Sequence, residues 1–384
     1  MNRSCALPVA AVLTIASAAC VHPHAMSTSL AGPSCGSPLD EGRAVGWVRP
    51  VRDGDVDALR EWCASVGPAQ LAARPSPLGG AVGVAASTPG LTIATWNVAG
   101  RDGDMRGFLT GALGYSCDAR HPEGHFVLLV QEAVRRSPVV PDAASEYAPP
   151  LPASDAGLPD LPTAARDCGL SLLYVPAMRN GAEGHVEGRE DRGNAILSTL
   201  PLVDAGGIEL PFEGQRRVAA VASVVLPETA DTVRVASFHL DAFAGLARTL
   251  LSGGSSKERQ VLGLVEALGI PDEAGAPPGN VTTVVAGDLN TWSERQTAVT
   301  RLTRHFPESP PPDATPTRGA FPTDHIFVRT ARRPGERAPS PGLRVIPDSY
   351  RALADTYGSD HRPRLLRLAV DHPSPATSDQ PRSR

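Results

Sequence analysis

The sequence predicts an α/β domain in which mixed β-sheets are sandwiched with a few helices. Strand-like runs recur between Leu91 and Val370 at hairpin-like spacings, and only a few helical stretches interrupt them. Neither a Gly-x-Gly-x-x-Gly turn after a strand nor a Gly-x-x-x-x-Gly-Lys-Ser/Thr loop occurs, so a nucleotide-cradling doubly wound sheet is not expected. With 384 residues, 41% of them hydrophobic, the chain is long enough for one large domain with an appendage.

The net charge of the chain, −5, limits the partners that it is expected to bind tightly. A sequence-specific nucleic-acid binder usually carries a basic face, and this composition provides none. A nuclease that meets its phosphate through a bound metal is still compatible with an acidic chain.

The first residues are typical of a targeting segment. Arg3 supplies a positive charge, an apolar stretch runs from Ala6 to Ala19, and small residues precede a cleavage point. The sequence Ser17-Ala18-Ala19-Cys20 resembles a bacterial lipobox, although a larger aliphatic residue is more usual at position 17. We therefore expect an exported protein with a signal peptide at 1–19. It would be periplasmic or anchored to the outer membrane through lipid on Cys20, with secretion after ordinary cleavage as the alternative.

Three further regions are expected after the signal peptide. Residues 20–90, rich in Pro, Gly and Ala, would form an extension or linker with one helix near 56–66. Residues 91–371 would form the main, catalytic domain, and residues 372–384 a disordered tail.

Cysteine usage fits an exported chain. Removal of Cys5 and lipidation of Cys20 would leave an even number of thiols, namely Cys35, Cys63, Cys117 and Cys168. Four thiols allow three pairings, and the sequence does not choose among them. The pairing that we prefer joins Cys35 to Cys63 and Cys117 to Cys168. No Cys/His spacing indicates zinc.

The main domain begins with a β-rich run at Leu91–Asn97, followed by an expected helix near Met105–Leu113. The continuous apolar run Phe126–Val130 predicts a fully buried strand that ends in Gln131-Glu132. Because a buried strand normally stops at a neutral turn, a Glu at its tip indicates a function. The Pro- and Ala-rich segment 136–163 is expected to be a surface loop.

The rest of the domain alternates strands with two capped helices. Further strands are predicted at 171–175, 194–198, 217–226, 233–239, 324–328 and 365–370. Ser255-x-x-Glu258 forms a capping box that predicts a helix from Ser255, and Ser293-x-x-Gln296 predicts another helix.

The stretch Val284-Val285-Ala286-Gly287-Asp288-Leu289-Asn290 predicts a buried strand that delivers polar groups at its C-terminal end. Asp288 and Asn290 lie two residues apart on an extended segment, so their side chains point the same way. The Asp288 carboxylate can accept a proton or orient a water near a metal, and the Asn290 amide can donate to a phosphate oxygen. An ordinary Asp/Asn turn is the alternative for these residues alone. Because other predicted strands in this chain also end in polar groups, we favour a functional role for Asp288 and Asn290 over an ordinary turn.

Seven short motifs occur in the order and rough spacing of one superfamily. They are Trp96-Asn97, Gln131-Glu132, Gly193-Asn194-Ala195-Ile196-Leu197-Ser198, Phe238-His239-Leu240, Gly287-Asp288-Leu289-Asn290, Thr323-Asp324-His325-Ile326 and Ser359-Asp360-His361. From about Leu91 to Val370 the chain resembles the endonuclease/exonuclease/phosphatase superfamily, which contains deoxyribonuclease I, apurinic endonucleases, neutral sphingomyelinases and inositol polyphosphate phosphatases. The resemblance implies a four-layer α/β sandwich. Two mixed, mostly antiparallel sheets would pack face to face between helices, with the site at one end.

The resemblance also implies a divalent metal, Mg²⁺ in the first place, with Mn²⁺ or Ca²⁺ as alternatives. Glu132 would bind the metal, Asn97 would assist at the metal or phosphate, and Asp360 would lie near the metal. The hard oxygen preference of Mg²⁺ suits a carboxylate that leaves several positions to water.

Five further residues receive catalytic roles from the resemblance. Asp288 would position or activate the attacking water, Asn290 would hold a phosphate oxygen, and His239 would donate to the phosphoryl oxygens. His361 would be the general base or a charge stabiliser, with Asp324 fixing its tautomer and raising its basicity. Some phosphodiesterases of this group orient the second His with a Glu, and the sequence shows no such partner for His239.

The expected activity is hydrolysis of phosphate esters by a monomer, in the first place as a phosphodiesterase or nuclease acting on DNA or RNA. A sphingomyelinase-like lipid phosphodiesterase and an inositol polyphosphate phosphatase are the alternatives. The lipid enzyme ranks lower because aromatic residues are only 4% of the chain and no aromatic cluster occurs in 136–163 or 329–347. A non-catalytic surface lipoprotein on the same fold would be expected to lack Glu132, Asp288 or His361, and all three are present.

Overall fold

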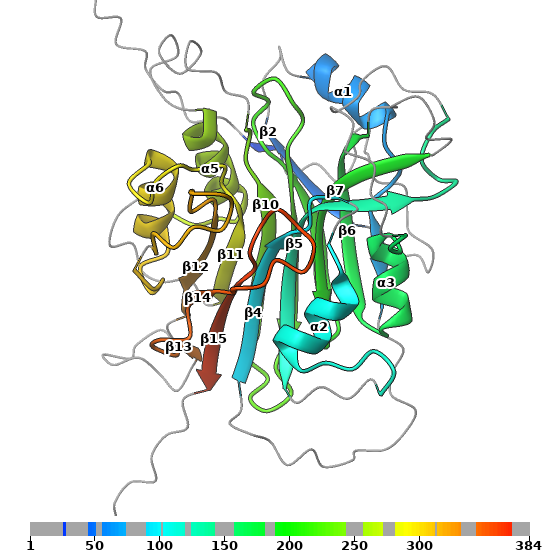
Figure 1. Cartoon of the computed structure of the whole chain (residues 1–384). Helices are drawn as coiled ribbons and strands as arrows, with labels where there is room; N and C mark the ends of the chain where they lie inside the picture. The colour runs from blue at the N-terminus through cyan, green and yellow to red at the C-terminus, as the bar shows by residue number, and fades with distance from the viewer. Residues whose placement is uncertain are drawn as a thin grey trace, which may run out of the picture.

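Two β-sheets form the centre of the protein in this computed structural model (Figure 1). The structure describes residues 26–27, 45–50, 56–73, 90–100, 103–119, 124–142, 157–180, 189–242, 256–271, 281–311, 313–331 and 343–370. The signal peptide, Cys20, Cys35 and the tail at 372–384 lie outside these residues. Among the described residues, no helix is both long and apolar enough to cross a membrane.

The first sheet has seven strands. In spatial order they are β1 (Met26–Ser27), β2 (Gly46–Pro50), β8 (Val203–Glu209), β9 (Val218–Val225), β10 (Thr232–His239), β11 (Thr282–Asp288) and β12 (Asp324–Arg329). The pairs β2/β8 and β10/β11 are parallel, and the other neighbours are antiparallel.

The second sheet has eight strands. Along its main path they are β13 (Leu343–Val345), β15 (Arg364–Val370), β4 (Gly90–Asn97), β5 (His125–Arg136), β7 (Glu190–Ser198), β6 (Ser171–Arg179) and β3 (Gln70–Ala72), while β14 (Arg351–Ala352) also pairs with β15. Only β4/β5 is a parallel pair. The predicted class, α/β with two mixed and mostly antiparallel sheets, is confirmed.

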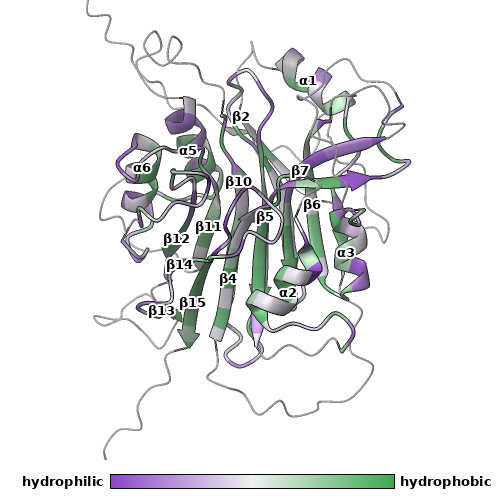
Figure 2. Cartoon of the chain, viewed as in Figure 1, coloured by the Kyte–Doolittle hydropathy of each residue, from purple (hydrophilic) through white to green (hydrophobic). Residues whose placement is uncertain are grey.

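Helices lie outside the two sheets, and apolar clusters join them to the strands. One cluster joins α2 (Met105–Leu113) and α3 (Leu161–Asp167) to the eight-stranded sheet. Another joins α5 (Ser256–Ala267) and α6 (Thr297–His305) to the seven-stranded sheet. Figure 2 shows that the strands between these helices are predominantly hydrophobic.

A third apolar cluster lies between the two sheets. Ile93 and Leu129 come from the eight-stranded sheet, and Val235 and Val284 come from the seven-stranded sheet. All four side chains are fully buried. Apolar burial therefore fixes the two sheets face to face, and their strand ends form one shared edge.

The structure corrects three local predictions. Strand β5 continues past Glu132 to Arg136, because a β-bulge between Val130 and Ala133 lets the ladder with β7 resume. Helix α6 has Gln296 as its N-cap without a side-chain capping bond, so the capping box predicted at Ser293 is wrong. The expected loop 136–163 contains the start of α3, which Asp160 caps by accepting a hydrogen bond from the Thr163 amide (3.1 Å).

One of the predicted disulfides is confirmed. Cys117, after α2, is joined to Cys168 at the end of α3. Cys63 is also disulfide-bonded, and Cys35, the partner that we expected for it, lies outside the described residues.

The segment expected as a linker contributes strands to both sheets. β2 pairs with β8 and β3 pairs with β6, so each sheet gains residues from the region before the main domain. A buried ion pair fastens the region in place. Arg135 forms two hydrogen bonds with Asp191 (3.0 and 2.6 Å) and a third with the carbonyl of Pro68 (2.6 Å), and Asp191 accepts from the amide of Gly67 (2.8 Å).

We predict that Arg135→Met lowers the free energy of unfolding by about 3–5 kcal/mol, because Asp191 would stay buried without its cationic partner. Arg136→Met is the matched control. The Arg136 side chain is half exposed in its ion pair with Glu190, so its loss should cost no more than about 1 kcal/mol. Urea unfolding of the oxidised proteins measures both values. Equal losses in the two variants would contradict the proposed importance of the buried pair.

His325, on β12, is a second buried polar residue. Its Nε2 donates to the carbonyl of Pro322 (2.8 Å), and its ring lies against Phe327. Burial lowers the pKa of His325 to about 4, and the positive charge of Arg364 adds to this effect. The folded protein therefore holds a neutral imidazole at this position.

We predict that His325 makes folding stability depend on pH. Because its pKa is lower in the folded chain, its contribution is complete above about pH 6.5 and is lost as the pH falls towards about 4, by up to about 3 kcal/mol. His325→Gln keeps a donor for Pro322 but does not titrate. Unfolding free energies measured from pH 7 to 4 should fall less steeply in this variant, and identical slopes would show that the prediction is wrong.

Candidate active site

The strand directions bring the polar strand ends to one edge of the sandwich. β4 and β5 run parallel, as do β10 and β11, while β12 and β15 run antiparallel to their neighbours β11 and β4. The register places His239 beside Asp288, and Asp288 beside Asp324, on three adjacent strands. Gly287 allows this close pairing, since a Cβ there would lie 1.7 Å from the carbonyl oxygen of Phe238.

Asp288 lies at the centre of the site and is fully buried. Its Oδ1 accepts from the backbone amide of Asn290 (2.7 Å), and its Oδ2 accepts from Nδ2 of Asn97 (3.0 Å). The Nε2 atoms of His239 and His361 lie 3.4 and 3.7 Å from the same Oδ2. Burial raises the pKa of Asp288 to about 6, against the lowering effect of the charge on His361. This carboxylate can exchange a proton near neutral pH.

His361 forms a hydrogen-bonded pair with Asp324. Nδ1 of His361 donates to Oδ2 of Asp324 (2.8 Å), and the same oxygen accepts from the hydroxyl of Thr323 (2.8 Å). Burial alone would lower the pKa of His361, but the charges of Asp324 and Asp288 outweigh burial and raise the pKa to about 9. His361 is therefore an imidazolium at neutral pH, with its Nε2 directed towards the site.

The chain around His361 is held in place by three hydrogen bonds. Trp96 donates from its indole nitrogen to the carbonyl of His361 (3.2 Å), and the hydroxyl of Ser359 accepts from the amide of His361 (3.0 Å). Ser359 also donates to the carbonyl of Asn97 (2.7 Å). These bonds fix the His361 loop on the end of β4.

His239, in contrast to His361, is neutral. Nδ2 of Asn290 donates to Nε2 of His239 (2.8 Å), so the imidazole proton is on Nδ1, which faces Oε1 of Glu132 at 3.9 Å. Burial, followed by the positive charge of Arg217, lowers the pKa of His239 well below its usual value. The second hydrogen of the Asn290 amide goes to the carbonyl of Leu240 (2.9 Å). The Asn290 amide thus orients His239 and leaves no hydrogen for a phosphate oxygen.

Glu132 stands at the β-bulge of β5 with a positive φ of 53°. Its side chain is 24% exposed, and its two ionisable partners, His239 and Arg192, lie 3.9 and 4.0 Å away. A partly open carboxylate at a conformation that non-glycine residues rarely adopt is typical of a functional position. Its oxygens fit a hard divalent cation that keeps several waters.

The other two residues predicted near a metal are partly engaged. Oδ1 of Asn97 accepts from the amide of Ala99 (3.0 Å), which leaves one lone pair for a cation. Asp360 is half exposed; its Oδ2 pairs with Arg318 (2.8 Å), and its Oδ1 lies 3.7 Å from Nε2 of His361. The structure therefore brings Asp360 to the His361 side of Asp288 and Glu132 to the His239 side.

Asp288, Asp324 and His361 also lie close enough to one another to hold a metal ion, with ligand atoms within 4.8 Å. However, Nδ1 of His361 and Oδ2 of Asp324 already bind each other, and all three residues are buried. This group is therefore suited to proton and charge chemistry, and the partly open Glu132 carboxylate is better suited to a metal.

Several polar and aromatic residues at this edge were not predicted from the sequence. Arg192, Arg217 and Lys257 are not among the residues predicted above. The exposed rings of Trp292 and Phe321 lie in the loops after Asn290 and before Asp324. Arg192, Trp292 and Phe321 each lie within two positions of a motif, and this proximity is the signal that could have identified them. Arg217 and Lys257 lie far from every motif, so no local signal marks them.

Comparison with known proteins places this site in a family. No curated protein matches the chain. The catalytic domain of human Nocturnin with bound sulfate is similar in structure, with 14% identity over 73% of this chain and 94% of that one and a TM-score of 0.47. An endonuclease/exonuclease/phosphatase family protein from Leptotrichia buccalis has 10% identity over 73% and 100% of the two chains and a TM-score of 0.43.

Sphingomyelinase C from Streptomyces griseocarneus is also similar, with 15% identity over 73% of this chain and 99% of that one and a TM-score of 0.35. The model of the Endonuclease/Exonuclease/phosphatase family matches residues 94–361, which is more than half of the chain and includes every residue of the site described above. The chain therefore belongs to the endonuclease/exonuclease/phosphatase family, whose members hydrolyse phosphate esters.

Proposed function

We propose that this chain is a metal-dependent phosphodiesterase of the nuclease type. The observation that carries the proposal is the arrangement around Asp288. A carboxylate with a pKa of about 6 lies 3.4 Å from a neutral imidazole, His239, and 3.7 Å from a charged one, His361. Such a group offers a base and a cation at one point, and the Nδ1–H of the neutral His239 is a donor on the side of Glu132. These are groups that hydrolysis of a phosphate ester can use.

In the proposed reaction, Asp288 accepts a proton from the attacking water at Oδ2. The water oxygen forms a bond to phosphorus, and the bond from phosphorus to the leaving oxygen breaks, with the electron pair going to that oxygen. Nε2–H of His361 stabilises the developing negative charge on the phosphoryl oxygens, and Nδ1–H of His239 is a second donor. Asp324 keeps His361 charged, while Asn97 and Asn290 hold Asp288 and His239 in place.

Glu132 would hold the metal, with Asn97 nearby, while Asp360 lies on the His361 side of Asp288. When bound, a divalent cation supplies Lewis acidity and offsets the negative charge of the phosphate. Mg²⁺ is the first choice, because the available ligands are oxygens and the carboxylate is partly open to water.

A nucleic acid or nucleotide substrate is favoured by the exposed Trp292. The Trp292 side chain is 65% exposed, and the Lys257 ammonium lies 5.6 Å from its ring centre. Lys257 also donates to the carbonyl of Asn290, so this pair adjoins the site. An aromatic face beside a cation is suited to stack a base and meet a phosphate. Two exposed rings, Trp292 and Phe321, provide little area for entering a lipid surface.

We also propose that the protein is exported, with lipid on Cys20 or by secretion. The Cys117–Cys168 disulfide supports an oxidising compartment, because disulfides of this kind persist outside the reducing cytosol. N-terminal sequencing of protein from the native cell tests this proposal, since the mature chain should begin at or shortly after Cys20.

We predict that EDTA abolishes hydrolysis and that Mg²⁺ or Mn²⁺ restores it. Glu132→Gln should require a higher Mg²⁺ concentration for half-maximal activity, because a neutral amide is a weaker ligand for a hard cation. Glu228→Gln is the control, since Glu228 pairs with His125 at the opposite end of the sheet. Full activity in chelator, with the metal verified absent, would rule out the metal assignment.

We predict that His361→Ala lowers kcat on the order of 10²–10⁴-fold with the fold intact, because the cationic donor is lost. Asp324→Asn should have a smaller effect in the same direction. His125→Ala, at the far end of β5, is the matched histidine control and should keep its turnover.

The assay for these variants is one panel of substrates with Mg²⁺: plasmid DNA, RNA, sphingomyelin vesicles, inositol polyphosphates and bis-p-nitrophenyl phosphate. Hydrolysis of nucleic acid or of the chromogenic diester that disappears in His361→Ala supports the proposal. Hydrolysis of vesicles alone would show that the substrate is a lipid, and wild-type turnover in His361→Ala would reject the proposed role of the pair.

A further inference from the structure

Arg217 is a buried cation whose hydrogen-bonding groups are mostly unused. Its side chain is only 7% exposed, and it lies just before β9 at the edge of the sandwich that carries the site. One of its terminal nitrogens donates to Gln215 (3.3 Å), and its Nε has no hydrogen-bond partner among the described residues. A guanidinium has five N–H donors, so most of them are free to bind a ligand.

Three other buried arginines of this chain are differently arranged. Arg216, the next residue, forms two hydrogen bonds with Glu209 (2.8 and 2.9 Å) and two with backbone carbonyls. Arg135 is paired with Asp191, and Arg364 with Asp313. Because the fold supplies a carboxylate in direct contact with each of these three guanidinium groups, the free donors of Arg217 indicate a ligand of opposite charge.

Arg192 lies at the same place. Arg192 and Arg217 line one small pocket together with Glu132, Asn194 and His239. The single ion contact of Arg192 within the described part of the chain is the long one with Glu132, at 4.0 Å. Two cations thus share a pocket in which the acidic lining residue is assigned to the metal.

The strand order locates this pocket relative to the reaction centre. Arg217 precedes β9, which neighbours β10 on the side away from β11, and Arg192 is on β7, which neighbours β5 on the side away from β4. The two arginines therefore lie one strand beyond His239 and Glu132, in the direction opposite to His361, and the pocket extends from those two residues to the arginines. Adjacent strands are ~4.8 Å apart, so a ligand in the pocket would lie next to a phosphate at Asp288.

We propose that Arg192 and Arg217 bind a second phosphate of the substrate, adjacent to the phosphate that is cleaved. This proposal rests on the proposed function for the identity of the cleaved group. The substrate class is a phosphodiester with a neighbouring phosphate, such as a nucleotide ester with a further terminal phosphate. Guanidinium groups suit this ligand, because their planar N–H pairs match phosphate oxygens.

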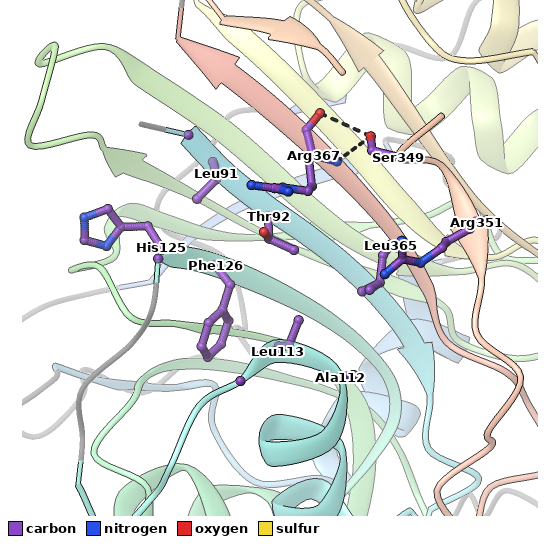
Figure 3. A pocket seen from close by; sticks show the side chains of 13 residues that line it. Leu91, Thr92, Ala112, Leu113, His125, Phe126, Ser349, Arg351, Leu365 and Arg367 are labelled. Atoms are coloured by element: carbon purple, nitrogen blue, oxygen red, sulfur yellow. Dashed lines mark hydrogen bonds between the residues drawn. The ribbon is translucent and has the colours of Figure 1, made fainter. Parts of the chain in front are cut away.

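The groove at the opposite end of the eight-stranded sheet offers a contrast and a control. Arg351 and Arg367 line this groove with Thr92, Ser349 and His125, as Figure 3 shows. Both arginines are exposed, so water satisfies their donors and no further ligand is required. Arg367→Met therefore removes an arginine at the opposite end of the sandwich without altering the pocket at Arg217.

The first experiment measures binding of inorganic phosphate to the full mature chain by calorimetry, with Mg²⁺ and again in EDTA. Arg217→Met should weaken binding by at least about 10-fold in both conditions, since the charge-assisted hydrogen bonds to phosphate are lost. Arg367→Met should bind as the wild type does. Arg217→Lys, which keeps the charge, should lie between them and serves if Arg217→Met does not fold. Equal phosphate affinity in wild type and both Arg217 variants would overturn the proposal.

The second experiment compares two chromogenic diesters that differ by one phosphate. They are thymidine 5′-(p-nitrophenyl phosphate) with and without a 3′-phosphate. In the wild type, the 3′-phosphate should raise kcat/KM by about 10-fold, mainly through KM. In Arg217→Met this ratio should approach one, and in Arg367→Met it should stay at the wild-type value.

The two experiments separate this proposal from the proposed function. If the wild type hydrolyses both diesters equally well, the second phosphate is not recognised and the inference is wrong while the function stands. If neither diester is hydrolysed, the proposed function fails, and phosphate binding that depends on Arg217 still decides the inference. A purely structural role for Arg217 would lower kcat/KM for both diesters by the same factor, which would also overturn the proposal.

Discussion

Burial of Asp288 is the constraint on which the site depends. A fully buried carboxylate loses its hydration and must be stabilised by the groups that replace water. Asn97 and the Asn290 amide supply hydrogen bonds, and His361 supplies charge. The same burial keeps His239 neutral, because a second imidazolium would face both desolvation and the nearby cations. Of the two histidines on either side of this carboxylate, one is therefore neutral and the other is positively charged, and their surroundings cause the difference.

Much of the site could be predicted because its residues terminate regular strands. Asn97, His239 and Asp288 each end a strand, and Asp324 begins one, so an apolar run identified their place in the chain. The register of the strands then brings these residues together in space. Local sequence does not reveal that register. The bulge at Glu132 could not be predicted, since it depends on how β5 resumes its pairing with β7.

The predictions that failed or were incomplete have related physical causes. The capping box at Ser293 was wrong because a turn separates Ser293 from the helix, which begins only at Thr297.

Arg216 and Arg217 are identical neighbours in the sequence, yet one is paired with Glu209 and the other lines the pocket beside Glu132 and His239. Their difference arises from the distant residues that each side chain meets. Sequence alone therefore marked neither as functional.

The strands β2 and β3 give the region before the main domain a structural role in both sheets. The start of the family match at residue 94 suggests a shorter chain that would still contain the whole site. Such a chain would lose the partners of β8 and β6 and would present their backbone groups to solvent. Unpaired strand edges readily associate with other chains, so the shortened protein would be prone to aggregation before its activity could be judged. The folded unit therefore includes residues before the segment 94–361 that matches the family model. A protein expressed for study should begin before Gly46.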